Sequence, residues 1–404
     1  MNVVHISNGS IPIPPGDIAA STEEHIYLLT QNMAQLGCNV HVIGIKGGKP
    51  QEPERQQSKA IFHDVWWPPL PSDYTYQFLH RLNSYILFTS KLFLFSSFSA
   101  IPMSQLLSKE KIDVIHFYNP NVALIYIIAG KLRRKRPVIV YCPFNPYGLT
   151  KFSWPKRIAY FAEVLSLKWV DHIIASNESV NNWLVNEFKL DPQKITQICT
   201  GTDVEGVEKL FSQKKQVNHH SNILLCTGKV CKRKNQFTAV KAMIKVLSEH
   251  PDIKLVFTGP CIETDYMSLM QDFISQNGLS AYVEFRGEVT KQELYQLYSD
   301  ALMFLFPTTA EIDPSSLKEA LIFGLPVIAS DIKSIADVIV KEKESAILID
   351  PYDVDRFASA VIRLLNDDNL RQNMSEKATK LGQSFSYQSI ANQTLAMYEK
   401  LVRA

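Results

Sequence analysis

The sequence predicts an α/β protein made of two doubly wound, Rossmann-like domains. A chain of 404 residues is too long for one hydrophobic core, so two domains of about 200 residues each are expected. Strand and helix patterns alternate through the first half, and a second alternation follows the polar stretch 212–222. We therefore place an N-terminal domain at 1–212 and a C-terminal domain at 213–385, followed by an amphipathic helix at 386–404.

Composition and charge are those of an ordinary soluble globular protein. Lys+Arg against Asp+Glu is 19 against 14 in the first 200 residues and 23 against 26 in the rest, so the halves carry +5 and −3. This asymmetry is too small to indicate a nucleic-acid partner, but it favours an anionic surface or acceptor on the N-terminal side. The six cysteines are scattered and the first residues form a strand pattern, so we expect a cytoplasmic protein with reduced thiols and no secretory leader.

The N-terminal domain begins with a βαβ unit. Residues 2–6 predict a buried strand, a Pro-rich loop containing Gly16 follows, and a helix leads to a second strand at 39–45. Two further apolar stretches, within 113–120 and 137–148, predict buried strands that run into loops. The order of these elements indicates a parallel sheet.

Two stretches of this domain are candidates for membrane contact. Residues 81–107 are the most apolar part of the chain, but Lys91 interrupts them and no run reaches the roughly 18 residues of a spanning helix. They form either a buried helix or a helix in shallow contact with lipid. The basic run 131–136 is either a solvated helix end or a site for anionic headgroups. Peripheral contact with the inner face of a membrane is thus one expectation.

The most informative stretch of the C-terminal domain is 306–330, which predicts a strand, a loop, a short helix and another strand. Asp313 is expected to cap the helix, with Pro314 in its first position and Gly324 just past its end. Amides in the first helical turn have no helical acceptor, so such a helix start binds anions. The amides expected to do so are those of Ser315, Ser316 and Leu317.

A basic loop precedes this stretch in the chain. A strand ends at Gly228, and Lys229 and Lys234 follow five residues apart in a loop that opens a helix. Ammonium groups and oriented amides both stabilise the negative charge that develops on a leaving diphosphate. Together, the loop and the helix start predict a diphosphate site.

Glu311, seven intervening residues and Glu319-Ala320, followed by Gly-x-Pro-Val-Ile-Ala at 324–329, resemble the donor-site signature of retaining glycosyltransferases of family 4, which have the GT-B fold. The resemblance covers nearly the whole chain, with specific motifs in the second half and weak ones in the first. It implies two Rossmann-like domains facing across a cleft, with the C-terminal helix crossing back to the first. It also implies a nucleotide sugar in the second domain and an acceptor in the first.

The resemblance implies a role for each candidate side chain. Glu319 accepts hydrogen bonds from the ribose hydroxyls, and Glu311 faces the transferred sugar and steadies positive charge at its anomeric carbon. Lys229 and Lys234 bind the diphosphate, so the expected catalytic groups are these two lysines and Glu311. Gly16 and Gly228 are expected to lie against the donor. The acceptor-side candidates are His116, Asn119, Cys142 and Asn145, although a histidine at a strand end is also a common structural residue.

Four features depart from the family pattern. Lys229 stands for an arginine and so lacks its bidentate fork, and Asn235 stands for a glycine. Gly16 is followed by Asp17 where the family usually has a second glycine. Asp313 and Pro314 replace an aromatic residue and a glycine. If Asp313 caps the helix, its carboxylate competes with the diphosphate for the same amides.

A metal site and a cofactor are not expected. Asp353 and Asp355 form an Asp-x-Asp pair of the kind that binds a divalent metal in the other large glycosyltransferase fold. Here the pair follows a strand pattern and precedes a helical one, so helix capping explains it. Only the nucleotide sugar is expected as a co-substrate.

The expected function is metal-independent, retaining transfer of a hexose from a nucleotide sugar to a hydroxyl of a glycan, a lipid-linked acceptor or a small molecule. UDP is the expected nucleotide on family frequency alone. No histidine base is evident near Cys142, which fits a front-face mechanism in which the leaving phosphate takes the acceptor proton. The alternatives are a nucleotide-sugar epimerase of the same architecture and a non-catalytic partner of a glycosyltransferase, the latter motivated by the departures.

Overall fold

The computed structural model shows two compact α/β units, each described here by itself. Unit 1 comprises Met1–Gly201 and Tyr387–Ala404, and unit 2 comprises Thr202–Ser386. The structure describes residues 1–7, 13, 21–45, 55, 58–65, 95, 98–118, 136–143, 154–210, 221–311, 313–339 and 344–403.

The division between the units lies at 201/202, eleven residues before the boundary at 212/213 that the polar stretch suggests. The Thr202 amide donates to the Phe385 carbonyl at 2.8 Å, and the Asp203 carboxylate pairs with Lys291 Nζ at 2.9 Å. These bonds attach the short helix α7 (Val204–Leu210) to unit 2. The polar stretch 212–222 therefore does not mark the division between the two units.

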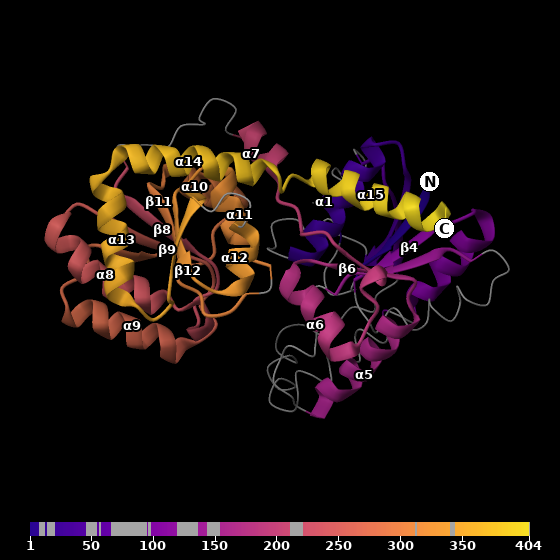
Figure 1. The fold of residues 1–404 in the computed structure, drawn as a ribbon, viewed down its shortest axis with the longest axis horizontal. Helices are drawn as coiled ribbons and strands as arrows, with labels where there is room; N and C mark the ends of the chain where they lie inside the picture. Colours follow the sequence, from indigo (N-terminus) through magenta and orange to yellow (C-terminus); the bar gives the residue numbers. More distant parts are fainter. Residues whose placement is uncertain are drawn as a thin grey trace. The chain divides into compact units, whose positions relative to one another are not determined.

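Unit 1 is built on a parallel sheet whose described strands run in the order β3-β2-β1-β4-β5-β6-β7 (Figure 1). Strands β4 and β6 are buried along their whole length, as expected of a parallel sheet covered on both faces. The strands are β1 (Asn2–Ile6), β2 (Asn39–Ile45), β3 (Ile61–Val65), β4 (Val114–Phe117), β5 (Val138–Tyr141), β6 (His172–Ala175) and β7 (Ile195–Gln197). Its helices include α1 (Ser21–Gln35), α5 (Trp154–Trp169), α6 (Glu178–Phe188), the 3-10 turn η3 (Pro192–Lys194) and α15 (Tyr387–Arg403), and the described residues 98–109 are also helical.

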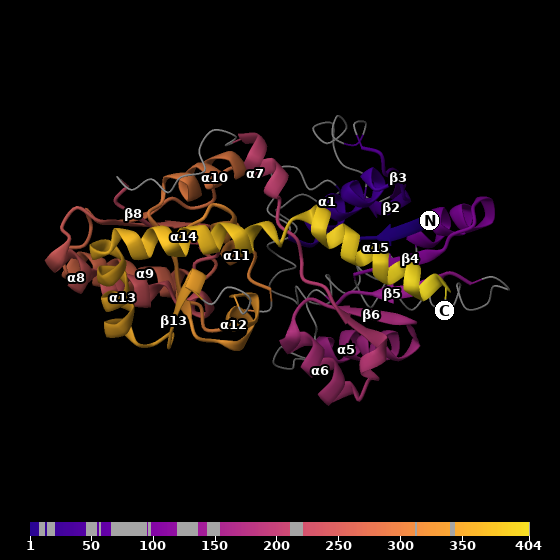
Figure 2. The same ribbon diagram turned by 45° about the horizontal axis from the view of Figure 1, so that its top comes forward.

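The last helix of the chain, α15, lies beside α1 in unit 1 (Figures 1 and 2). Ile26 and Leu29 of α1 share a hydrophobic cluster with Ile390, Ala391 and Tyr398 of α15, and each is at most 1% exposed. Burial of such side chains is worth about 1.5–3 kcal/mol each. The amphipathic pattern at 386–404 thus serves to pack this helix on the first unit.

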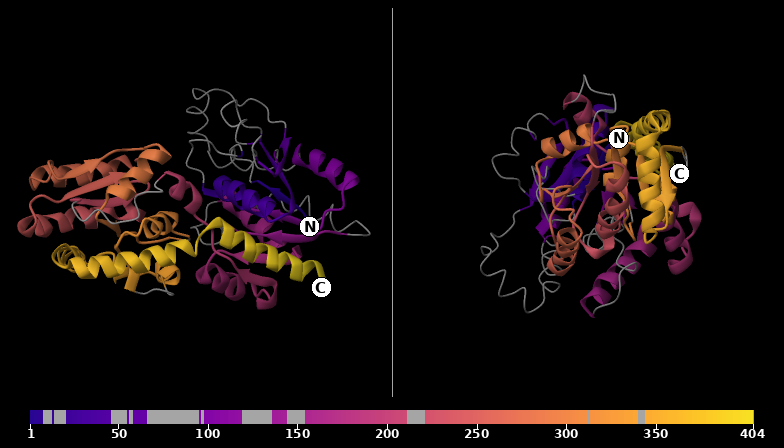
Figure 3. Two further views of the ribbon diagram at one scale, coloured as in Figure 1. Left: turned by 90° about the horizontal axis from the view of Figure 1, so that it is seen from above. Right: turned by 90° about the vertical axis from the view of Figure 1, so that its left-hand side faces the viewer.

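Unit 2 contains a second parallel sheet, with described strands in the order β10-β9-β8-β11-β12-β13. Figures 1 and 3 show its helices on both sides of the strands, with α8, α9 and α13 on one side and α10, α11 and α12 on the other. The strands are β8 (Ile223–Thr227), β9 (Lys254–Thr258), β10 (Val283–Phe285), β11 (Met303–Phe306), β12 (Val327–Ser330) and β13 (Ala346–Ile349). The helices are η4 (Lys232–Lys234), α8 (Gln236–Glu249), α9 (Thr264–Gln276), α10 (Lys291–Asp300), α11 (Ser315–Ile322), α12 (Lys333–Ile339), α13 (Val354–Asn366) and α14 (Asp368–Gln383).

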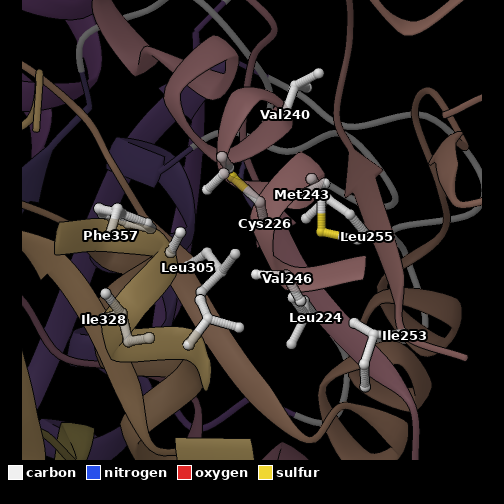
Figure 4. Close-up of a cluster of buried hydrophobic side chains, with 14 of the residues drawn as sticks. Leu224, Cys226, Val240, Met243, Val246, Ile253, Leu255, Leu305, Ile328 and Phe357 are labelled. Atoms are coloured by element: carbon white, nitrogen blue, oxygen red, sulfur yellow. The ribbon is translucent and has the colours of Figure 1, made fainter. Parts of the chain in front are cut away.

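The core of unit 2 lies between its central strands and the helices α8 and α13 (Figure 4). Leu224, Leu255 and Leu305 come from three adjacent strands and pack in one cluster with Met243 and Val246 of α8. All five side chains are at most 1% exposed. This core fixes the strands whose carboxyl ends carry the candidate site.

Buried histidines and tyrosines join the sheet of unit 1 to its helices. His5 Nδ1 lies 2.8 Å from the Tyr118 hydroxyl, and His116 Nδ1 lies 2.6 Å from the Tyr398 hydroxyl of α15. Burial, and secondarily the charge of His25, lowers the pKa of His5 to about 3. Burial, followed by the charges of His5 and His25, likewise lowers the pKa of His116 well below its ordinary value. Both imidazoles are therefore neutral in the folded state.

Unit 1 is expected to lose stability as the pH falls below about 6.5. The unfolded chain protonates these histidines at their ordinary pKa of 6.5, whereas the folded state takes up no proton until a much lower pH, about 3 for His5. Each buried histidine then lowers the free energy of unfolding by about 1.4 kcal/mol per pH unit. Urea titrations between pH 7.5 and 5.0 test this, and His5→Gln should show a shallower pH dependence than the unaltered protein. An equal slope in both proteins contradicts the assignment.

Candidate functional site

The site lies at the carboxyl ends of β8 and β11, which are neighbours in the sheet of unit 2. From β8 the chain winds outward through β9 and β10, and then it returns to β11 and continues outward through β12 and β13. The strand order therefore reverses between β8 and β11. Loops at such a reversal diverge and leave room for a ligand at the sheet edge.

The loop after β8 brings a lysine back toward the strand ends. Gly228 has φ +121°, and a Cβ atom there would lie 3.3 Å from Lys234 Cε and 3.4 Å from its Nζ. A glycine thus permits both the backbone conformation and the path of the Lys234 side chain. The loop ends in the turn η4, followed by Asn235 in the left-handed conformation with φ 52°.

The two lysines predicted to act together occupy different environments. Lys234 Nζ lies 2.7 Å from Glu311 Oε1 and 4.9 Å from the centroid of the Phe306 ring, and its side chain is 11% exposed. Lys229 is exposed, and its backbone carbonyl accepts a hydrogen bond from Gln236 Nε2 at 2.9 Å. Of the two lysines, Lys234 is the one for which the described contacts include an ion pair with Glu311.

Glu311 is held by three donors at one carboxylate oxygen. Its Oε1 lies 2.7 Å from Lys234 Nζ, 2.8 Å from Arg233 Nη1 and 3.0 Å from Thr308 Oγ1. The side chain is only 9% exposed, so these charge-assisted bonds act in a partly desolvated setting. Arg233 and Thr308 are not among the residues that the sequence predicts, although Arg233 lies in the basic loop. The Glu311 side chain is thus fixed in place at the carboxyl end of β11.

Glu319 is held by a tyrosine from a neighbouring helix. The Tyr298 hydroxyl donates to Glu319 Oε2 at 2.9 Å and lies 2.9 Å from Thr227 Oγ1 and 3.2 Å from the Ser316 carbonyl. Burial, followed by the Glu319 charge, raises the pKa of Tyr298 well above its ordinary value. The phenol therefore stays protonated and donates its single proton, so Thr227 donates to it in turn. Tyr298 and Thr227 carry no sequence signal that marks them as site residues.

Asp313 was predicted to cap the helix α11, and this prediction is wrong. The N-cap of α11 is Pro314, and the Asp313 carboxylate forms an ion pair with Lys318 Nζ. The Ser315 amide donates to the Asp313 carbonyl at 3.0 Å and the Leu317 amide to the Pro314 carbonyl at 3.1 Å. Two of the three amides expected to lack acceptors therefore have backbone partners.

The burial of Lys318 explains this correction. Its side chain is fully buried, with Nζ 5.5 Å from the Phe385 ring centroid. A buried ammonium group without a counter-charge is far more costly than an unmade cap, so the Asp313 carboxylate turns to Lys318. The expected competition between this carboxylate and a diphosphate for the helix amides is thereby removed.

The end of α11 is as predicted. Gly324 follows the last turn with φ +70°, and its amide donates to Leu321 while the Leu325 amide donates to Ala320, at 3.0 Å each. This pair of bonds is a Schellman motif. A Cβ atom on Gly324 would also lie 2.6 Å from Thr379 Oγ1, so glycine is required for two reasons.

The Asp-x-Asp pair serves as a helix cap, as predicted. The Asp353 carboxylate accepts from the Arg356 amide at 2.9 Å, and Asp355 lies in the first turn of α13. Among the described residues, no cluster of three or more histidine, cysteine or acidic side chains is placed to hold a metal ion.

The candidates of unit 1 are only partly described. Gly16, Asn119 and Asn145 lie outside the described residues. His116 is 1% exposed, and its ring nitrogen Nδ1 lies 2.6 Å from the Tyr398 hydroxyl of α15. These contacts favour a structural role for His116 over a role at the acceptor site. Cys142 is 4% exposed, and its amide donates to the Phe117 carbonyl at 3.0 Å.

Two family models match this chain. One is described as Glycosyltransferase Family 4 and matches residues 22–205, and the other is described as Glycosyl transferases group 1 and matches residues 207–381. A relative from Escherichia coli, named UDP-Gal:alpha-D-GlcNAc-diphosphoundecaprenol alpha-1,3-galactosyltransferase, is 23% identical over 67% of this chain and 70% of its own length.

Solved structures share the fold over nearly the full length of the chain. Sucrose-phosphate synthase from Thermosynechococcus elongatus matches with a TM-score of 0.72 and 17% identity, covering 99% of this chain and 98% of its own. HepE from Anabaena, solved with UDP and glucose, matches with a TM-score of 0.68 and 15% identity, covering 98% of this chain and 99% of its own. The two parallel sheets and these neighbours show that the fold is GT-B.

Replacing Lys318 by methionine is expected to destabilise unit 2 by about 3–5 kcal/mol, because the Asp313 carboxylate, 12% exposed, loses its counter-charge. The double variant Asp313→Leu/Lys318→Met should recover most of this loss, because it removes both charges. Urea unfolding measures both effects. Arg286→Met is the control, since Arg286 and Glu284 form an exposed pair worth roughly 0–1 kcal/mol. If Lys318→Met matches the control, the ion pair does not have this role.

Proposed function

We propose that this chain, which the models of Glycosyltransferase Family 4 and of Glycosyl transferases group 1 match at residues 22–205 and 207–381, transfers a hexose from a UDP-sugar to a hydroxyl acceptor with retention of the anomeric configuration. The observation that carries the proposal is the placement of Glu311 beside Lys234 at the edge of the β8–β11 pair. A cation that stabilises a leaving diphosphate and a carboxylate that stabilises a cationic sugar carbon are thereby adjacent.

The roles of the two glutamates follow from their partners. Glu311 has one oxygen engaged by two cations and a hydroxyl, so it acts as a fixed electrostatic group rather than as a covalent nucleophile. Glu319 is oriented by the neutral Tyr298 hydroxyl and accepts hydrogen bonds from the ribose. Lys234 binds the diphosphate together with the start of α11, whose first turn contains Ser316.

In the proposed reaction the bond between the anomeric carbon and the phosphate oxygen breaks, and the acceptor oxygen bonds to that carbon from the same face. The acceptor proton moves to the departing phosphate oxygen, so no separate protein base is needed. Lys234 stabilises the charge that develops on the phosphate, and Glu311 stabilises the charge on the sugar.

The choice of donor and acceptor rests on similarity. The relative from Escherichia coli uses UDP-Gal by its name, and HepE was solved with UDP. The same relative acts on a lipid diphosphate acceptor by its name, so a lipid-linked acceptor ranks before a free glycan or a small molecule.

A panel of UDP-, GDP- and ADP-sugars, scored by thermal stabilisation and by nucleotide release, tests the donor. UDP-sugars should stabilise the protein and be consumed only when an acceptor is present, and transfer should persist in EDTA. Lys234→Ala is expected to lower kcat about 10²–10³-fold. Glu319→Ala is expected to weaken donor binding about tenfold.

Lys245→Ala is the matched control, because Lys245 is an exposed lysine of α8 whose Nζ bonds only Ser359 Oγ, at 3.0 Å, among the described contacts. Conversion of the donor without an acceptor would indicate an epimerase, and absence of nucleotide binding would indicate a non-catalytic partner. Loss of transfer in EDTA would contradict metal independence.

We also propose that the first unit makes peripheral contact with an anionic membrane through α5. Phe161 and Trp169 are 63% and 43% exposed, and Lys168 is exposed next to Trp169. Aromatic side chains and lysines favour the interface of an anionic bilayer. Of the stretches first considered for this contact, 81–107 and 131–136, the structure describes only residues 95, 98–107 and 136. Among the described helices, none is long and apolar enough to cross a bilayer.

Sedimentation with phosphatidylglycerol vesicles tests this contact. The protein should bind these vesicles more tightly than phosphatidylcholine vesicles, and Phe161→Ser/Trp169→Ser should weaken binding about tenfold or more, because two apolar side chains no longer enter the interface. Leu269→Ser on α9, which removes an exposed apolar residue of unit 2, should leave binding unchanged. Equal binding of both lipid types, or an equal loss in the control, contradicts the proposal.

A further inference from the structure

Arg233 contacts four consecutive residues of the loop after β11. Its carbonyl accepts hydrogen bonds from the Thr309 amide at 2.8 Å and from Thr309 Oγ1 at 3.0 Å, and Thr308 Oγ1 lies 3.1 Å from it. Its guanidinium Nη1 donates to the Ala310 carbonyl at 2.6 Å and to Glu311 Oε1 at 2.8 Å. One residue thus ties the loop after β8 to the whole segment that ends in Glu311.

Arg233 and Lys234 hold the same carboxylate oxygen but differ in what else they can do. Lys234 has a single ammonium group, 11% exposed, that lies over the Phe306 ring. When that group turns toward a phosphate, its bond to Glu311 weakens. Arg233 is planar and already spans the Ala310 carbonyl and the Glu311 carboxylate, so it can keep both while Lys234 is engaged elsewhere.

The Arg233 side chain is 47% exposed, but its position is defined by the loop that it holds. A carboxylate that loses its cationic partner is free to rotate, and a displaced carboxylate stabilises a developing positive charge poorly. Arg233 therefore matters most for the position of Glu311 when Lys234 has turned toward the diphosphate.

We propose that Arg233 is a positioning residue that keeps the Glu311 carboxylate in place while Lys234 binds the donor diphosphate, and that Arg233 is not itself a diphosphate ligand. This rests on the proposed function, because it assigns a division of labour within that same site. It predicts that loss of Arg233 affects the transfer step more than it affects nucleotide binding.

The test compares Arg233→Met with Lys232→Met. Both remove one positive charge from the same turn, but the polar contact of Lys232 is made by its backbone amide, to Glu263 at 3.0 Å. We expect Arg233→Met to lower kcat about tenfold, to change the Kd for UDP by less than about twofold, and to be partly rescued in Arg233→Lys. Lys232→Met should behave as the unaltered protein. Steady-state kinetics and calorimetry with UDP give these values.

A double-mutant cycle decides whether Arg233 acts through Glu311. In the Glu311→Gln background, Arg233→Met should change kcat less than about twofold, because the group that it positions is already altered. The proposal is overturned if the loss is undiminished in that background, if the Kd for UDP weakens in parallel with kcat, or if Lys232→Met shows the same loss. If Arg233→Met does not fold, Arg233→Lys in both backgrounds completes the same cycle.

Failure of this inference is distinguishable from failure of the proposed function. If the unaltered protein neither binds UDP nor transfers sugar from any donor of the panel, the proposed function fails. If it transfers sugar and Arg233→Met is indistinguishable from Lys232→Met, only the role of Arg233 fails.

Discussion

The site depends on one carboxylate oxygen, Glu311 Oε1, that accepts from Lys234, Arg233 and Thr308. The donors come from the loops after β8 and β11, which the sheet places side by side at the reversal of strand order. The arrangement is therefore a consequence of topology, because no local sequence pattern brings residues 77 positions apart to one atom. It also means that the charge of Lys234, the main candidate for binding the diphosphate, is balanced by the Glu311 carboxylate before any ligand binds.

Two pairs of side chains, Asp313 with Lys318 and Glu319 with Tyr298, shape the start and the interior of α11. Lys318 turns the Asp313 carboxylate away from the amides of the first turn, and the Tyr298 hydroxyl orients Glu319. The unusual Asp313 is thus matched by an equally unusual buried lysine five residues later. The charges of Asp313 and Lys318 compensate each other. The Asp313 carboxylate is therefore neutralised and does not keep an anion from the start of α11.

The sequence pattern was sufficient to predict two α/β domains with parallel sheets, the end of α11 at Gly324 and the capping role of Asp353, since each depends on local pattern or short-range turn chemistry. The GT-B fold was predicted through the family resemblance. Only the family resemblance placed Glu311 in the same donor site as Lys234. Arg233 and Tyr298 could not be predicted, because their roles arise from contacts across the sheet. Asp313 was assigned to the wrong partner because its sequence position suggests a cap, whereas the burial of Lys318 is a tertiary property.

Asn235 adds a constraint on how this protein could diversify. The left-handed backbone of Asn235 is one that glycine also adopts. The side-chain nitrogen Nδ2 of Asn235 lies 3.0 Å from Thr238 Oγ1, 3.0 Å from the Pro307 carbonyl and 2.7 Å from the Pro351 carbonyl. Three strand-end loops are therefore tied by a single side chain that the backbone geometry does not itself require. A one-residue exchange for glycine would remove these three hydrogen bonds at once while keeping a backbone conformation that glycine readily adopts, which is a short evolutionary route to a site that accommodates a different ligand.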